Sequence, residues 1–322
     1  MPGLSLIITT HHRPQMLIRA IESARAATRG AVEVVVVDDA STDETARLCR
    51  SIPQITYVRA ERNQRVAGAR NLGILASRGE FLSFLDDDDV RLPGSLDRQL
   101  EALASEPHAG FIYGQAILSG QESTREEDCY PARCPQGDIF FRLLVQNFIP
   151  CGSVVFRRAC LSRVGLLDDA LAGIDDWDLW LRIAAIYPVI ALEQPVLRWR
   201  KSTPVSGQGT SQALEIVNLS TGQFRERWLA LPRVAETSAS QRRECSHLFS
   251  ENMAGHLLWE TWRAFAAGEV KMACRNILGA MRLHPAAMIR VAARRTSFRF
   301  FLTHAPGEWR DIKARTGQLP NS

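Results

Sequence analysis

Four consecutive aspartates at positions 86–89 are the residues of this chain best suited to chemistry. They follow an apolar run at 80–85 that is typical of a buried strand. Four adjacent carboxylates repel one another. A hard divalent cation such as Mg²⁺ or Mn²⁺ relieves the repulsion and keeps coordination positions open for phosphate oxygens. A solvated acidic turn that caps the helix expected after Pro93 is the alternative.

A second pair of carboxylates, Asp38 and Asp39, directly follows the apolar run 32–37. One of them could accept a hydrogen bond from a ribose hydroxyl or a base N–H, whereas a simple Asx turn would explain the pair without a ligand. The first strand is followed by Thr10-His-His-Arg-Pro14, and the chain has neither a G-x-G-x-x-G turn nor a Walker lysine motif. A dinucleotide-binding fold is therefore disfavoured.

The segment 63–73 holds a candidate phosphate contact. Gly68 and Ala69 would let the backbone approach a phosphate closely, and Arg70 could pair with it. Small residues that pack a helix against a sheet would give the same pattern.

Asp175 and Asp176 precede a helix whose apolar face includes Trp180. A carboxylate held at a helix entrance, beside aromatic side chains that exclude water, is suited to act as a general base. The alternative is that one of the two carboxylates caps the helix.

Short apolar runs alternate with amphipathic stretches over the first half of the chain. Strands are expected at 4–10, 32–37, 55–58, 80–85 and 111–118, and helices at 14–24, 42–49, 66–77 and 93–105. This alternation predicts an α/β fold, a parallel or mixed sheet covered on both faces. Ligands bind beyond the carboxyl ends of such strands, where both acidic clusters lie.

The second half of the chain changes character. A loop is expected at 119–136, followed by an apolar segment at 153–156, a helix at 177–185 and short strands at 189–192 and 196–199. Helical spacing then dominates at 213–229, 241–267 and 270–283, and the last two helices could pack as a hairpin. We therefore predict a catalytic domain over 1–210 and a helical region over 211–322.

Composition limits the function classes. Hydrophobic residues make up 46%, charged residues 23% and the net charge is +4, which gives no reason to expect nucleic acid binding. The segment 285–315 is rich in arginine, so it could meet an anionic membrane, or it could be a packed helix with a solvated basic face. Seven cysteines without a C-x-x-C pair suggest reduced thiols in a cytosolic protein, and the apolar stretches are too short to span a membrane. Membrane contact is thus expected from the cytoplasmic side.

Five blocks, in order and spacing, resemble family 2 glycosyltransferases. They are Ile7-Ile-Thr-Thr10 with Arg13-Pro14, Val36-Val-Asp-Asp-Ala-Ser-Thr-Asp43, Ala69-Arg-Asn-Leu-Gly73, Gly79-Glu-Phe-Leu-Ser-Phe-Leu-Asp-Asp-Asp-Asp-Val90 and Asp175-Asp-Trp-Asp-Leu-Trp-Leu-Arg182. The resemblance covers about residues 4 to 200. It implies a GT-A fold, a Rossmann-like open mixed sheet flanked by helices, and inverting transfer from a nucleoside diphosphate sugar.

The same resemblance implies roles for individual residues. The Thr9 and Thr10 backbone and Asp39 would hold the base, and Asp86 would contact the ribose. Asp88, with Asp86, would bind Mg²⁺ or Mn²⁺ at the diphosphate. Asp176, or its neighbour Asp175, would deprotonate the acceptor hydroxyl. The remaining residues expected to bind the nucleotide sugar are Arg13, Arg70 and Asp87.

The sequence departs from the family pattern at two places. The acidic pair begins with Asp175 where relatives commonly carry glutamate, which leaves the choice of base between the two aspartates open. Many relatives carry a histidine soon after the last strand, whereas the segment 198–209 contains none, so Arg200 or Lys201 could neutralise the diphosphate instead, or the metal has fewer protein ligands.

The donor base (uridine, thymidine or guanosine) and the acceptor (a glycan, a lipid-linked sugar or a protein) are open. The acceptor loops are expected at 119–136 and 149–153, and bacterial polysaccharide, lipopolysaccharide or other glycoconjugate synthesis is the expected setting. Two other functions compete. A sugar-nucleotide nucleotidyltransferase would carry a glycine-rich basic loop after its first strand, and a non-catalytic member of the fold would bind nucleotide or glycan without turnover.

Overall fold

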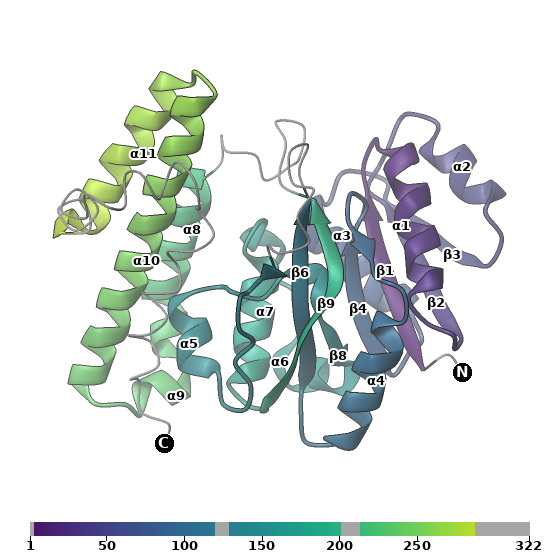
Figure 1. The fold of residues 1–322 in the computed structure, drawn as a ribbon, viewed down its shortest axis with the longest axis horizontal. Coiled ribbons are helices and arrows are strands. Elements are labelled where there is room, and N and C mark those ends of the chain that lie inside the picture. The colour runs from purple at the N-terminus through teal and green to yellow at the C-terminus, as the bar shows by residue number, and fades with distance from the viewer. Residues whose placement is uncertain (1–2, 120–128, 201–212, 287–322) are drawn as a thin grey trace. The chain divides into compact units, whose positions relative to one another are not determined.

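The computed structural model describes residues 3–119, 129–200 and 213–286, so Lys201 and residues 287–315 of the arginine-rich segment fall outside the described part (Figure 1). The chain divides into two compact units. One comprises Met1–Ile139 and Phe148–Lys201, and the other Phe140–Asn147 and Ser202–Ser322. The predicted domain boundary at residue 210 stays a prediction. The segment 140–147 is grouped with the C-terminal helices although it precedes them by many residues.

The first unit contains a nine-stranded mixed sheet, counted over the described residues. Its order is β3-β2-β1-β4-β8-β6-β9-β5, and β7 pairs with β6. β1 to β4 run parallel, β8 is antiparallel to both of its neighbours, and β9 runs parallel to β6. The strands are β1 Leu4–Thr10, β2 Val32–Asp38, β3 Ile55–Arg59, β4 Phe81–Asp86, β5 Val90–Arg91, β6 Phe111–Ser119, β7 Cys129–Tyr130, β8 Val155–Arg157 and β9 Val189–Arg200.

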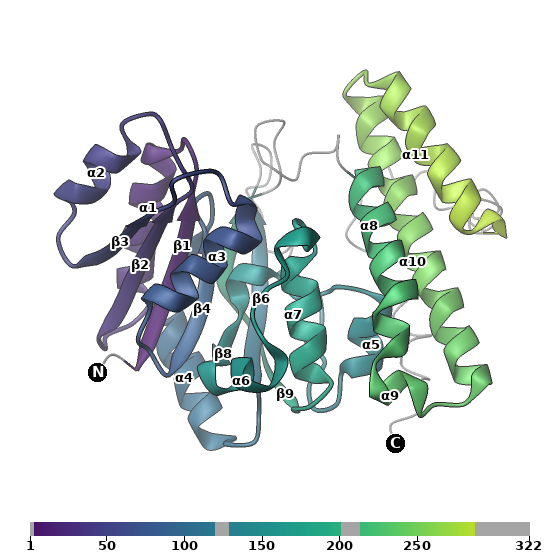
Figure 2. The same cartoon turned by 180° about the vertical axis from the view of Figure 1, so that it is seen from behind.

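Helices cover both faces of this sheet (Figures 1 and 2). They are α1 Pro14–Ala26, α2 Thr45–Ser51, α3 Arg65–Ala76, α4 Ser95–Ser105, α6 Leu161–Val164 and α7 Asp175–Ala184. Short 3-10 turns lie at Cys151–Ser153, Arg158–Cys160 and Asp169–Leu171. The predicted α/β fold class is confirmed.

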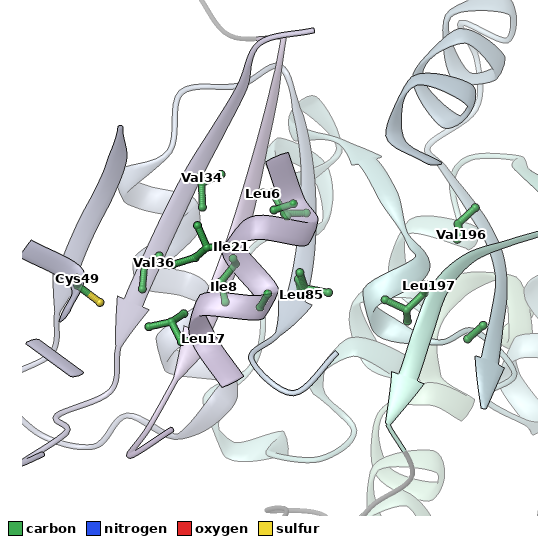
Figure 3. Packing of buried hydrophobic residues seen from close by; sticks show 13 residues of the cluster. Leu6, Ile8, Leu17, Ile21, Val34, Val36, Cys49, Leu85, Val196 and Leu197 are labelled. Carbon is green, nitrogen blue, oxygen red and sulfur yellow. The ribbon is translucent and has the colours of Figure 1, made fainter. Parts of the chain in front are cut away.

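Strand alternation assigns neighbouring side chains to opposite faces of the sheet. On one face Leu6 and Ile8 of β1 meet Leu17 and Ile21 of α1, and all four side chains are buried (Figure 3). On the other face Ile7 lies against Gly73 of α3, where an added Cβ would approach the Ile7 side chain to 2.2 Å. Trp180 of α7 packs on that face among Phe84, Phe111 and Phe156. Because β1 is buried on both faces, apolar residues stand next to one another in its centre, at Leu6, Ile7 and Ile8, instead of alternating with polar ones.

The second unit is helical in its described part. It contains α5 Phe140–Val145, α8 Ala213–Glu226, α9 Pro232–Ala235, α10 Ala239–Ala266 and α11 Val270–Leu283, with a 3-10 turn at Trp228–Ala230. Ser238 and Gln241 form a capping box at the start of α10. Gly268, at φ +79°, ends α10, and the Glu269 N–H donates to the Ala264 carbonyl at 2.8 Å. α10 and α11 lie side by side, which confirms the predicted hairpin (Figure 2).

Several element boundaries differ from the sequence expectation. The strands expected at 189–192 and 196–199 form one strand, β9, with a register shift opposite Gln115. The helix expected at 42–49 begins later, as α2 at Thr45, and the Asp43 carboxylate accepts the Thr45 N–H. Sequence reasoning missed α5 and β7, which are short. Across the described ranges, no helix is both long and apolar enough to cross a bilayer. All seven cysteines are free thiols, and the cytoplasmic location stays a prediction.

Candidate active site

The candidate site lies at the carboxyl ends of β1, β2 and β4. Register pairs Thr10 with Asp38 and Thr9 with Asp86, so the two acidic clusters flank the end of β1. The order of the parallel strands reverses at β1, since β2 and β3 lie on one side of it and β4 on the other. Such a switch point is where ligands bind in open α/β sheets.

The four aspartates form a tight turn between β4 and β5, closed by a hydrogen bond of 3.0 Å from the Asp89 N–H to the Asp86 carbonyl. Their side chains alternate in exposure. Those of Asp86 and Asp88 are 40% and 16% exposed, whereas Asp87 and Asp89 are buried. α4 begins at Ser95 after a left-handed glycine and receives no side-chain cap. The turn is therefore not a solvated acidic cap of α4, which was the alternative interpretation.

The two buried aspartates are held by the protein itself. The Thr10 hydroxyl donates to Asp87 Oδ2 at 2.7 Å, and Arg13 Nη1 donates to Asp87 Oδ1 at 3.0 Å. The Arg200 N–H donates to Asp89 Oδ1 at 2.9 Å. Arg13 also lies 3.5 Å from Asp88 Oδ2. Thr10, Arg13 and Asp87, all expected to bind the nucleotide sugar, thus bind one another through their side chains and fix the turn.

Asp38 and Asp39, for which a ligand contact and an Asx turn were the two interpretations, differ in their surroundings. Asp38 is fully buried, and its carboxylate accepts the Ser41 N–H, which forms the expected turn. It also accepts a hydrogen bond from the Tyr57 hydroxyl. Asp39 N–H donates to the Thr10 carbonyl at 2.9 Å, which fixes Asp39 beside the end of β1. Its carboxylate accepts the Gln64 N–H at 2.6 Å. Burial raises the pKa of Asp39, although the Gln64 hydrogen bond opposes the shift.

Arg70 joins the two carboxylate groups of the site. Its Nη2 lies 2.7 Å from Asp86 Oδ1 at the end of β4, and its Nη1 lies 2.9 Å from Asp175 Oδ2 at the start of α7. The guanidinium is buried over the Phe84 ring, 5.4 Å from the ring centre. Sequence reasoning expected Arg70 to pair with a phosphate. In the structure its charge is taken up by two carboxylates of the protein.

Asp175 and Asp176 lie in the first turn of α7, and neither is its N-cap, which is Ile174. The buried Asp175 makes the ion pair with Arg70, whereas Asp176 is only partly buried and accepts the Trp177 N–H at 2.7 Å. Burial and the neighbouring Asp175 charge raise the pKa of Asp176 to about 7, against the lowering effect of Arg70. A carboxylate with a pKa near neutrality suits proton abstraction.

The charge of the aspartate turn fits a divalent cation. Burial raises the pKa of Asp87 to about 6, and burial together with the Asp86 charge raises the pKa values of Asp88 and Asp89. The described residues contain no group of three or more histidine, cysteine or acidic side chains arranged to hold a metal by themselves. Mg²⁺ is commonly bound by one or two carboxylates together with substrate phosphates. Asp86 and Asp88, the more exposed pair, match that requirement.

Two further residues border the site. Arg200, expected near the diphosphate, points its guanidinium at the Met16 sulfur, 2.9 Å away, and Lys201 falls outside the described residues. Cys151, which sequence reasoning did not select, lies close enough to Arg70 and Asp176 for their charges to affect its pKa, which burial raises. The only sequence signal for Cys151 was its place in the acceptor loop expected at 149–153.

Comparison with solved structures defines the class of this domain. A mannosyltransferase from Pyrobaculum calidifontis, solved in complex with GDP-Man and Mn²⁺, superposes with a TM-score of 0.59 at 19% identity. The match covers 97% of this chain and 84% of that one. The shared mixed sheet with helices on both faces is the GT-A glycosyltransferase fold.

The chain belongs to glycosyl transferase family 2, whose pattern matches residues 5–164. An uncharacterized glycosyltransferase of Haemophilus influenzae is 30% identical over 184 residues, which is 56% of this chain and 61% of that protein. The succinoglycan biosynthesis protein ExoO of Rhizobium meliloti is 40% identical over 102 residues, 31% of this chain and 29% of that protein. The matched part of the chain thus spans about three fifths or less of these two relatives.

Proposed function

We propose that the protein transfers a sugar from a nucleoside diphosphate sugar to an acceptor hydroxyl with inversion at the anomeric carbon. The observation that carries this proposal is the pairing of Arg70 with both Asp86 and Asp175. Through these two ion pairs, Asp86 at the switch point of the sheet and the acidic start of α7 both lie against the Arg70 guanidinium. A donor site and a proton acceptor are therefore close neighbours, as transfer between two substrates requires.

The nucleotide would bind at the carboxyl ends of β1, β2 and β4. The Thr9 and Thr10 backbone and the Asp39 carboxylate would hold the base, and Asp86 would contact the ribose. Thr10, Arg13 and Asp87 would support the pocket by fixing the aspartate turn, because their side chains already bind one another. The mannosyltransferase complex with GDP-Man supports a nucleoside diphosphate sugar as donor.

Asp88, together with Asp86, would hold Mg²⁺ or Mn²⁺. When bound, the ion neutralises charge on the leaving diphosphate. The raised pKa values of Asp88 and Asp89 support this assignment, because burial and then repulsion by Asp86 disfavour the ionised carboxylates, and a bound cation would offset both effects. The Mn²⁺ in the mannosyltransferase complex is a further argument for a divalent ion.

Asp176 would act as the general base. Its carboxylate takes the proton of the acceptor hydroxyl while that oxygen forms a bond to the anomeric carbon. The bond from this carbon to the diphosphate oxygen breaks, and its electron pair leaves with the diphosphate. Asp175 is buried, with one carboxylate oxygen on Arg70 and the other on the Gly173 N–H, so the partly exposed Asp176 is the better candidate for contact with the acceptor.

The acceptor is proposed to be a glycan, a lipid-linked sugar or a protein in bacterial glycoconjugate synthesis. The similarity to ExoO, a protein of succinoglycan biosynthesis, supports a polysaccharide acceptor. Residues 149–153, next to Asp176 through Cys151, would form part of the acceptor pocket. The segment 119–136 is the other expected acceptor loop, and its residues 120–128 fall outside the described ranges.

The reaction products test the proposal. The protein is incubated with UDP-, dTDP- and GDP-sugars and Mn²⁺, and the products are separated. Slow donor hydrolysis should release a nucleoside diphosphate and, by NMR, a free sugar whose anomeric configuration is initially opposite to that of the donor. Release of pyrophosphate in the presence of sugar phosphate and nucleoside triphosphate would indicate a nucleotidyltransferase. Nucleotide binding without any turnover would indicate a non-catalytic member of the fold.

A further inference from the structure

The last described helix, α11, packs against the rest of its unit through small residues. Its buried positions are Ala273, Asn276, Gly279 and Ala280. An added Cβ at Gly279 would come within 2.6 Å of the Leu214 side chain, so α11 approaches α8 closely. The inward face of α11 therefore buries little side-chain volume, and its larger apolar residues lie elsewhere.

Three of those larger residues lie in a stripe on the outside of the helix, whereas Met272, Ile277 and Leu283 are partly buried. Val270, Leu278 and Met281 are 56%, 52% and 47% exposed, and Cys274, also exposed, lies between the first two. The spacing of four, four and three residues places all four on one helical face. Contiguous apolar surface of this kind marks a site of interaction.

A basic stripe runs beside the apolar one. Lys271, Arg275 and Arg282 are exposed, and a helix turns about 100° per residue, so the three side chains lie about 100° around the axis from the apolar stripe. The helix Val270–Leu283 contains no aspartate or glutamate. Its outer surface is thus an apolar band with positive charge along one side.

We propose that this face of α11 binds the surface of an anionic lipid bilayer, with the apolar stripe in the interface and the basic stripe at the lipid headgroups. Helices that lie in a membrane interface combine an apolar face with lysine and arginine beside it, and each cation near an anionic surface strengthens the attraction. At 14 residues, α11 is about 21 Å long and would lie flat on the bilayer.

Charge argues against two other candidates for covering this face of α11, a second copy of the helix and the chain that follows it. A second copy of α11 would bring two basic stripes together, and like charges repel. The chain that follows, residues 287–322, has seven lysines and arginines against two acidic residues, so it would also be repelled. The same segment would be attracted to the lipid surface that α11 prefers.

Vesicle sedimentation of the full chain tests the proposal. We expect binding to vesicles of phosphatidylcholine with one quarter phosphatidylglycerol and little binding to pure phosphatidylcholine. The double substitution Leu278→Ser with Met281→Ser should weaken binding about tenfold. Leu75→Ser is the matched control, because Leu75 is 71% exposed on α3 of the other unit, and this variant should bind like the wild type.

A charge variant, Arg275→Gln with Arg282→Gln, should also weaken binding about tenfold, whereas the control should again bind normally. Both variants change exposed side chains, so unchanged melting temperatures would show that the fold is intact. Undiminished binding of both variants to the anionic vesicles would overturn the proposal. It would also be overturned if the wild type were a dimer by light scattering that the Leu278→Ser/Met281→Ser variant dissociates.

Discussion

Arg70 and Asp175 form a buried ion pair, 2.9 Å between Nη1 and Oδ2, across 105 residues of sequence. The pair links α3 to α7, and the second Nη of Arg70 reaches Asp86 at the end of β4. A planar guanidinium can hold two carboxylates in fixed directions, which an ammonium group cannot do as well. Arg70 is therefore a positioning residue for the acidic start of α7, where the proposed base lies.

Replacing this guanidinium tests the positioning role. In Arg70→Lys the charge is kept and the two-sided geometry is lost, so donor turnover should fall about 10- to 100-fold. The acid limb of the pH profile should move only slightly, because a cation still faces Asp176. Arg70→Gln should move that limb to higher pH, since the charge that lowers the pKa of Asp176 is removed. Wild-type turnover in both variants would contradict the role.

Asp176→Asn separates catalysis from stability. Removal of a general base should lower turnover about 10²- to 10⁴-fold. Because the pKa of Asp176 is raised, the folded protein still holds a proton between about pH 4 and 7 that the unfolded chain has released. The free energy of unfolding therefore falls as pH rises through that window. Asparagine stays neutral, and the variant should melt at the same or a higher temperature than the wild type at pH 8. The exposed Asp169→Asn is the control. An inactive variant that also melts much lower would point to a structural role.

Donor turnover should depend on pH through the same group. The base must be ionised to take a proton, so kcat/KM should rise through about pH 7, the pKa to which burial and the Asp175 charge bring Asp176. The profile is measured under saturating Mn²⁺ so that proton competition at the aspartate turn does not contribute. An acid limb near pH 4 would mean that the base is a carboxylate with an ordinary pKa.

Close packing between α3 and β1 gives a prediction on the fold. Gly73→Ala would place a Cβ 2.2 Å from the Ile7 side chain and should cost about 1–3 kcal/mol of unfolding free energy. Gly255, inside α10, has open space at the same position, so Gly255→Ala should gain up to about 1 kcal/mol from helix propensity. Denaturant unfolding of the two variants measures the contrast. Equal stabilities would show that α3 can move away from β1 without cost.

Much of the fold could be predicted from the sequence because the signals are local. The apolar runs of β1 to β4 and the helical spacing of α10 and α11 each depend on neighbouring residues, and the acidic strand ends could be placed by a general rule. The order of β8, β6 and β9 could not be predicted, because pairing between distant strands leaves no local pattern. Residues 140–147 illustrate the same limit, since their grouping with the C-terminal helices rests on contacts far along the chain.

Sequence reasoning selected candidate site residues but not their partners. Asp86 and Asp88, the more exposed pair of the turn, and the pair at the start of α7 were selected from residue type and position. The internal hydrogen bonds of Asp87 with Thr10 and Arg13 could not be seen, because they span more than seventy residues. For the same reason Arg70 was expected at a phosphate rather than between two carboxylates.

Calorimetric titration with UDP, dTDP and GDP, with and without Mn²⁺, tests the central claim most directly. The account predicts that one of the three nucleotides binds only with the metal, and that Asp88→Asn abolishes this binding while the exposed-site control Asp169→Asn keeps it. Equal binding without metal, or full binding by Asp88→Asn, would contradict a metal-dependent donor site at the aspartate turn.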